Sequence, residues 1–170
     1  DTPGAALAVA VEGDTAYVAD GEAGLVVIPS TMSVAGVFDT PGIAMDVAIA
    51  GNYACIADGA NGLVVLNRFP LDNMSLAGWL DTLGNATALA LQGDYVYLAD
   101  GDKGLRIIDI TNPQDPAEVG FYDTAGIAVD VAVAGDRVYV AEKDNGVRVF
   151  DVADPATPVP VLFYATPGAA

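Results

Sequence analysis

The sequence predicts an all-β protein, a β-propeller or a propeller-like array of four blades in which each blade is a four-stranded antiparallel sheet. A pattern of about 42 residues occurs four times along the chain, and each copy alternates short apolar runs with Gly, Asp and Asn. In addition, the first predicted strand of a copy has one bulky and one small apolar face, which favours stacked blades over a two-sheet sandwich. We treat residues 1–170 as a single repeat domain.

Four similar tetrads, DTPG, DTPG, DTLG and DTAG, mark the starts of the copies. The predicted blades are therefore residues 1–38, 39–80, 81–122 and 123–164. Two glycine columns recur at matching places and indicate turns, namely Gly13, Gly51, Gly93 and Gly135, and then Gly24, Gly62, Gly104 and Gly146. Residues 165–170 read ATPGAA and nearly repeat the start of the chain, so we interpret them as the start of a next repeat or as a clasp.

Within one copy, Gly, Asp and Asn residues separate four predicted strands. In the last copy we expect strands at about 128–134, 137–142, 147–152 and 159–164. Gly135 and Asp136 make the first hairpin turn, a second turn follows at 143–146, and the proline-bearing segment 153–158 makes the longer third connection.

The first strand indicates how the blades pack. Val129, Val131 and Val133 are expected on one face of this strand, with Asp130 and small alanines on the other. Because both faces are largely apolar, both must be covered, and we expect this strand to be the innermost of its blade. On the second strand, one column is expected to be largely buried: Tyr17, Cys55, Tyr97 and Tyr139.

Composition excludes several classes of function. The formal net charge is −17, so nucleic acid and anionic lipid surfaces should repel the chain, and no apolar run is long enough to insert in a membrane. With no His and a single Cys, the sequence has neither Ser-His-Asp nor Cys-His sites, nor thiolate clusters for metals. We predict no catalytic residue and no cofactor-binding residue.

Acidic residues are expected to gather at one end of the sheets, because two antiparallel strands return the chain to the end at which it entered. The candidate cation ligands are Asp20, Asp58, Asp100 and Glu142, which close the second strands, and Asp46 and Asp130, which open first strands. The tetrads add Asp1, Asp39, Asp81 and Asp123 to the same end. Oxygen ligands of this kind suit Ca²⁺ or a cationic partner, but turn formation explains each column separately and is the interpretation that we prefer.

The third strands carry a family resemblance. They read GLVVI, GLVVLN, GLRIIDI and GVRVFDV, and each follows AYVADG, ACIADG, VYLADG or VYVAEK. These segments resemble LVIVD repeats, although Pro29 and Asn67 replace the motif Asp in the first two copies. The resemblance implies a β-propeller of a bacterial or archaeal surface or secreted protein, and it brings no catalytic residues with it.

Together these features favour a non-enzymatic scaffold, adhesive or self-assembly module that is extracellular or attached to the cell surface. One alternative is a Ca²⁺-dependent hydrolase or lyase that uses the acidic face, and another is the ligand-binding part of a larger secreted sensor. The expected partner is protein, either a second copy that joins head to tail or further blades of a longer propeller.

Overall fold

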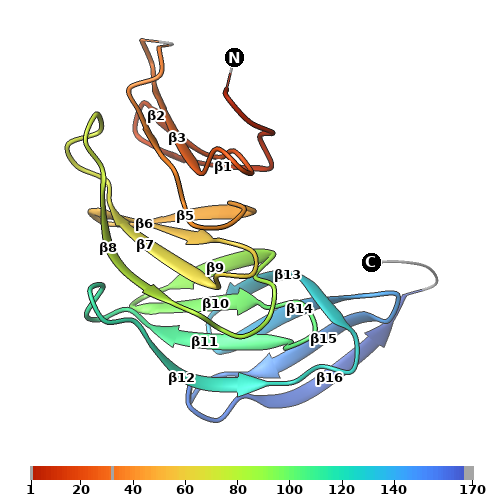
Figure 1. Ribbon diagram of the computed structural model, residues 1–170. Helices are drawn as coiled ribbons and strands as arrows, with labels where there is room; N and C mark the ends of the chain where they lie inside the picture. The colour runs from red at the N-terminus through yellow and green to blue at the C-terminus, as the bar shows by residue number, and fades with distance from the viewer. Residues whose placement is uncertain (1, 32, 167–170) are drawn as a thin grey trace.

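The computed structural model describes residues 2–31 and 33–166 of the chain. They fold into four sheets, and every sheet has four antiparallel strands joined in chain order, which confirms the predicted fold class. The sheets follow one another as blades of an open arc (Figure 1). Among the residues described, no helix is long and apolar enough to cross a membrane.

Each predicted copy holds one blade. Blade 1 comprises β1 (Ala8–Glu12), β2 (Thr15–Ala19), β3 (Leu25–Pro29) and β4 (Gly36–Phe38). Blade 2 comprises β5 (Asp46–Ala50), β6 (Tyr53–Ala57), β7 (Leu63–Asn67) and β8 (Ser75–Leu80). Blade 3 comprises β9 (Ala88–Gln92), β10 (Tyr95–Ala99), β11 (Leu105–Asp109) and β12 (Ala117–Tyr122). Blade 4 comprises β13 (Ile127–Ala134), β14 (Arg137–Lys143), β15 (Gly146–Asp151) and β16 (Val159–Ala165).

The second glycine column positions the third strand against the end of the fourth. At Gly24 the backbone has a φ of +76°, and a Cβ built there would lie 2.2 Å from the carbonyl oxygen of Phe38. Gly62 shows the same arrangement, with a φ of +72° and a distance of 2.3 Å to the carbonyl oxygen of Leu80. Only glycine combines this left-handed conformation with so close a backbone approach, so the column marks a packing requirement as well as a turn.

The first strands β1, β5, β9 and β13 contact one another in chain order and lie on the inner side of the arc (Figure 1). This confirms that the strand with alternating bulky and small residues is innermost. Each blade therefore has a rear face, toward the preceding blade, and a forward face, toward the following one. The bulky residues of the first strand, such as Val47, lie on the rear face, and the small ones, such as Ala10, lie on the forward face.

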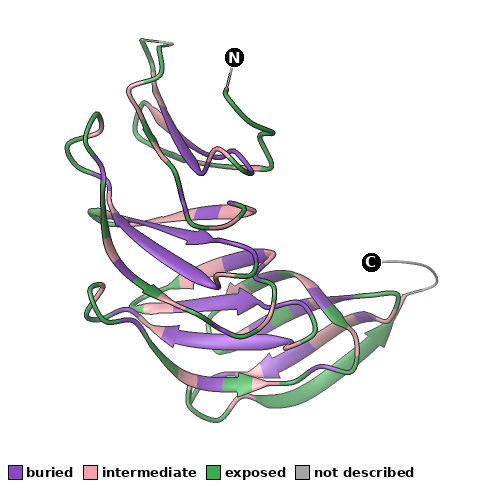
Figure 2. Ribbon diagram, in the orientation of Figure 1, coloured by how far each residue is buried: buried purple, intermediate pink, exposed green. Residues whose placement is uncertain are grey.

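Three apolar cores hold the arc together, one between each pair of neighbouring blades. The central strands of blades 2 and 3 are accordingly buried along most of their length (Figure 2). In the core between blades 1 and 2, Tyr17 from the forward face of blade 1 packs with Val47 of blade 2. Tyr97 and Val131 hold the same places between blades 3 and 4, so one interface design recurs along the chain.

Blades 1 and 4 lie apart at the two ends of the arc (Figure 1). The second-strand column is buried, as predicted, at Tyr17, Cys55 and Tyr97, but the prediction is wrong for Tyr139, which is 42% exposed. The reason is that no blade among residues 2–31 and 33–166 covers the forward face of blade 4. At the other end, Val9 and Val11 are 62% and 69% exposed because no described blade covers this part of the rear face of blade 1.

The chain ends agree with the sequence reading as far as they are described. The four strands of the last copy begin and end within one residue of the predicted bounds. The near-repeat at 165–170 falls mostly outside the described residues, since only Ala165 and Thr166 of it are described.

Candidate functional site

The acidic residues that close the second strands are buried and hold the chain link that enters their own blade. Asp20 accepts hydrogen bonds from the backbone N–H of Gly4 at 2.6 Å and from the hydroxyl of Thr2 at 2.8 Å. Asp58 accepts a bond of 2.8 Å from the N–H of Gly42. These contacts connect the DTxG tetrad to the end of the second strand. An aspartate that accepts backbone N–H groups in this way stabilises a turn.

In blades 3 and 4 the same position also meets an arginine. Asp100 accepts a 2.7 Å bond from the hydroxyl of Thr82, and its Oδ2 lies 3.8 Å from Nε of Arg106. Glu142 accepts a bond of 2.5 Å from Nε of Arg148, and the N–H of Gly126 donates to it at 3.1 Å. The four carboxylates therefore serve four separate links, one in each blade.

Burial changes the acidity of two of these groups. Loss of hydration raises the pKa of Asp100 to about 6, although the hydroxyl of Thr82 and the charge of Arg106 oppose the shift. The pKa of Asp58 is raised for the same reason, against the hydrogen bond from the N–H of Gly42. Because each charge is sheltered from water, these carboxylates are structural acceptors within the fold.

The two first-strand aspartates lie on the inner side of the arc. Asp46 accepts a bond of 2.8 Å from the N–H of Val47 and a second, of 2.9 Å, from the N–H of Leu89 in blade 3. It thus joins two neighbouring blades. Asp130 likewise accepts a bond of 2.8 Å from the N–H of the next residue, Val131. In the part of the chain described here, no group donates to its second carboxylate oxygen. The charge of Asp130 also adds to the burial that raises the pKa of Asp46.

The predicted cation ligands do not form a single cluster. Within residues 2–31 and 33–166, no group of three or more His, Cys, Asp or Glu side chains is placed to hold a metal ion. The four strand-closing acids belong to different blades. Asp1 of the tetrad column lies outside the described residues. Calcium binding at this end of the sheets stays a prediction.

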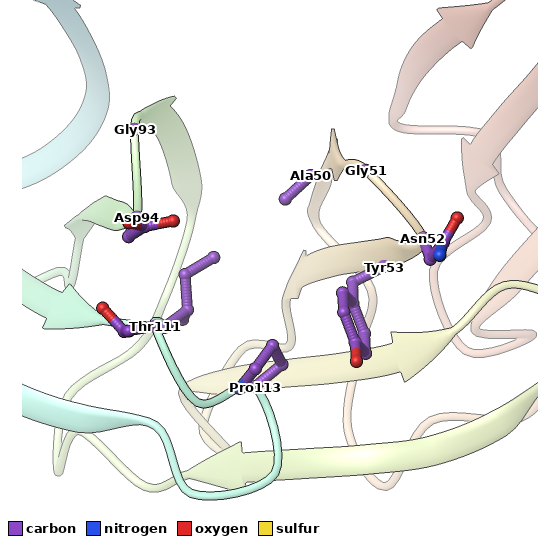
Figure 3. Close-up of a pocket in the computed structure, with 9 residues that line it drawn as sticks. Ala50, Gly51, Asn52, Tyr53, Gly93, Asp94, Thr111 and Pro113 are labelled. Atoms are coloured by element: carbon purple, nitrogen blue, oxygen red, sulfur yellow. The ribbon is translucent and has the colours of Figure 1, made fainter.

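A pocket with a volume of about 450 Å³ lies between blades 2 and 3, at the end of the sheets away from the acids (Figure 3). It is lined by the first hairpins of both blades, at Asn52 and Tyr53 and at Gly93 and Asp94, and by the connection that carries Pro113. Sequence reasoning missed this pocket. Its lining consists of turn residues whose separation depends on how two blades pack, and no motif marks it.

The outer strands carry exposed aromatic residues. Trp79 on β8 borders a shallow pocket of about 190 Å³ together with Pro41 and Leu76. Further along the arc, the guanidinium groups of Arg106 and Arg148 each lie 4.8 Å from the ring centre of an aromatic residue on the last strand of their own blade, Phe121 and Phe163. Arginine therefore occupies the aromatic faces of blades 3 and 4, whereas no arginine of the described chain lies over Trp79.

The ends of the arc provide two further surfaces. We call the first the open forward face of blade 4, formed by Asp130, Ala132, Tyr139, Ala141 and Val147, and it contains a groove of about 190 Å³. The second is the open rear face of blade 1, formed by Val9, Val11 and Ala16. Equivalent residues inside the arc, such as Val47, Cys55 and Tyr97, are buried in the cores between blades. Both faces therefore have the composition of a blade interface, and no blade in the described part of the chain covers them.

Comparison with known families decides what kind of repeat this is. The family model for the LVIVD repeat matches the chain four times, at residues 3–40, 41–67, 83–124 and 125–166. The chain belongs to the LVIVD repeat family. The second match ends at the third strand of blade 2, where Asn67 stands in place of the motif Asp. A search of curated proteins finds no match to this chain.

Solved structures share the fold. The chain resembles the crystal structure of the computationally designed Ika8 protein with a TM-score of 0.79 at 13% sequence identity, over 99% of this chain and 52% of Ika8. It also resembles the computationally designed Ika4 protein, with a TM-score of 0.77 at 13% identity, over 90% of this chain and 94% of Ika4. The LVIVD chain therefore spans about half the length of Ika8, and at this identity the likeness concerns the fold alone.

Proposed function

We propose that this LVIVD repeat chain is a non-enzymatic structural module, which serves as a scaffold, adhesive or self-assembly element at the cell surface or outside the cell. The observation that carries the proposal is that, within the described residues, both end blades present an interface-like face that no other blade covers. Val9 and Val11 on the first strand of blade 1 are exposed, whereas Val47, Leu89 and Val131 on the first strands of the other blades are buried.

Such faces are costly in water. Burying apolar surface contributes about 25 cal/mol for each Å² that is removed from solvent, and repeat units depend on their neighbours for that burial. Blade interfaces are thus the surfaces through which this chain binds other protein. The engagement of Asp20, Asp58, Asp100 and Glu142 in chain links supports a structural role for the acidic end, and the family resemblance supports a location at the surface or outside the cell.

The test is to add a fifth blade. Residues 1–38 are appended after Tyr164 in a chain whose own blade 1 carries Val9→Glu, so that self-association cannot hide the effect. The proposal expects slower amide hydrogen exchange in β13 and β14 and a higher midpoint of urea unfolding than in the unextended variant, because the added blade covers Tyr139.

The matched control appends the same segment with Val9→Glu and Val11→Glu within it. This extension has the same length and turns but a charged rear face, and it should leave exchange in β13 unchanged. Equal protection by both extensions, or by neither, would contradict the proposed role of the end faces.

A further inference from the structure

The residues at the three internal blade interfaces are matched in size. Tyr17 and Tyr97 on forward faces pack against β-branched pairs on the next rear face, which are Val47 with Ile49 and Val131 with Val133. At the remaining interface the forward residue is the small Cys55, and its core holds Leu89 and Leu91 instead. A large residue on the forward face is thus paired with shorter side chains on the rear face, as dense core packing requires.

This pairing identifies what fits the open forward face of blade 4. On this face Tyr139 stands at the position of Tyr17 and Tyr97. The matching rear face must therefore carry short β-branched residues rather than leucine. The open rear face of blade 1 carries Val9 and Val11 in that place, followed by Ala16. The two uncovered faces of one chain are therefore complementary to each other in size.

The polar groups on the two faces also match. At the interface between blades 2 and 3, Asp46 accepts a hydrogen bond from the N–H of Leu89, which pairs with Leu98 in its blade. Val9 pairs with Val18 in the same register, so its N–H has the same direction, toward the inner edge of blade 1. Asp130 stands on blade 4 where Asp46 stands on blade 2, and its second carboxylate oxygen lacks a donor within the described chain.

We infer that the partner of these faces is a second copy of this chain, which joins head to tail so that Asp130 accepts the N–H of Val9 in the other copy and Tyr139 packs on Val9 and Val11. The inference rests on the proposed function and names the partner. Since the described part of each 170-residue copy has one open face of each kind, two such copies related by a two-fold axis close the ring with two identical contacts.

The curvature of the arc agrees with such a pair. The whole chain superposes on about half of Ika8, with a TM-score of 0.79, so its four blades follow the path of half of a fold about twice as long. Two copies placed end to end account for the length of such a fold. Blades 1 and 4 of one copy remain apart, which leaves both faces accessible to the second copy (Figure 1).

The net charge of the chain opposes the pairing. Each copy carries −17, and like charges on two approaching molecules repel over about 8 to 10 Å at physiological ionic strength. The contact itself is mainly apolar and is weakened little by salt. Association should therefore become stronger as ionic strength rises, which is the reverse of the behaviour of a pair held by opposite charges.

The first experiment measures solution mass by light scattering over a range of protein and salt concentrations. The 170-residue chain should have twice its 17.2 kDa mass, and Val9→Glu should return it to one copy. Val161→Glu is the matched control, because Val161 is also an exposed valine on a strand, 49% exposed, but on the outer β16, and its substitution should keep the pair. A single-copy mass for the unchanged chain, or a polymer larger than two copies, would overturn the closed pair.

The second experiment separates face matching from misfolding. Val9→Glu leaves the forward face of blade 4 intact, and Tyr139→Glu leaves the rear face of blade 1 intact. Each variant alone should have the mass of one copy, whereas an equimolar mixture should form a one-to-one complex through the remaining pair of faces. Circular dichroism checks that both variants stay folded, which is expected because both side chains are exposed.

A mixture that stays at the mass of one copy would overturn the inference. The outcome is distinguishable from failure of the proposed function: if the appended blade protects β13 but the copies do not pair, the end faces still bind blades and only the identity of the partner is wrong.

Discussion

Asp100 shows the effect of bringing a turn-forming carboxylate into the interior of a β-array. Its hydrogen bond to Thr82 fixes the link between blades 2 and 3, while burial raises its pKa to about 6 from an ordinary value of 3.8. The folded state therefore holds the proton of Asp100 more tightly than the unfolded chain does. This contribution to stability is present below about pH 4 and is lost as the pH rises through about 6.

We therefore expect the free energy of unfolding to fall between about pH 4 and about pH 7, by up to roughly 3 kcal/mol from Asp100 alone. The raised pKa values of Asp46 and Asp58 act in the same direction. Urea denaturation across this pH range should show a shallower slope for Asp100→Asn. Asp14→Asn, at an exposed hairpin, is the control and should keep the original slope, and an unchanged slope in Asp100→Asn would show that this group does not carry the effect.

Leu83 is strained by the turn that it occupies. It has a φ of +63° and is 78% exposed, so its side chain stabilises neither the backbone conformation nor the core. A left-handed conformation costs an ordinary residue roughly 1–2 kcal/mol, whereas glycine adopts it freely. We expect Leu83→Gly to raise the free energy of unfolding by about 1 kcal/mol, as measured by urea denaturation. Leu83→Ala removes the same apolar surface but keeps Cβ, so a similar gain from alanine would argue against backbone strain.

At the scale of an element, the blade interface is a set of matched side chains. Cys55 is fully buried, burial raises the pKa of its thiol to about 12, and Leu89 shares its core. The thiol therefore behaves as a small apolar group. The interface between blades 2 and 3 differs from the other two because this small residue is balanced by larger ones opposite it.

A double-mutant cycle tests that balance. We expect Cys55→Tyr to lower the free energy of unfolding by about 1–3 kcal/mol because the larger side chain overfills the core. Adding Leu89→Val should recover part of that loss. The coupling free energy from urea denaturation should be at least about 0.5 kcal/mol in the stabilising direction. Leu76→Val, at an exposed site on β8, serves as the control partner for Cys55→Tyr, and equal coupling for Leu76 and Leu89 would contradict the size-matching argument.

At the scale of the whole molecule, the main contacts of each blade are with its neighbours in the arc, so stability is expected to vary along the arc. Blade 1 is joined to blade 2 by a backbone bridge between Gly21 and Ala44 and by the side chain of Arg68 of blade 2. This arginine donates a 2.5 Å bond to the hydroxyl of Tyr17, pairs with Glu12, and also donates to the carbonyl oxygen of Gly51 in its own blade at 2.7 Å.

Arg68→Ala should therefore loosen blade 1 without disturbing the far end of the arc. We expect amide hydrogen exchange to accelerate in β1 to β3, because the free energy of local opening of blade 1 falls by roughly 2–3 kcal/mol. Strands β13 to β15 should keep their protection. Arg137→Ala removes an exposed ion pair with Asp151 in blade 4. It should change the free energy of local opening, as measured by hydrogen exchange, by less than about 1 kcal/mol at any strand. Uniform acceleration along the chain after Arg68→Ala would mean that the four blades unfold as one cooperative unit.

The sequence by itself determined the repeat, the strands and the turns, because these depend on local patterns. Glycines with positive φ recur where two backbones meet, and apolar alternation defines which residues share a face. The stacking of the blades also followed, since a strand with two apolar faces, one bulky and one small, must lie between two neighbours. In this way the innermost position of the Val131 strand could be predicted before any contact was known.

Only the tertiary structure decided which of the equivalent residues are covered. Tyr139 has the same local sequence setting as Tyr17, yet it is 42% exposed where Tyr17 is 1% exposed, because burial depends on the presence of the next blade. For the same reason Asp46 bridges two blades and Asp130 does not, and the pocket between the hairpins at Asn52 and Asp94 has no motif. Local patterns specify a blade, whereas the environment of each face is set by the position of that blade along the arc.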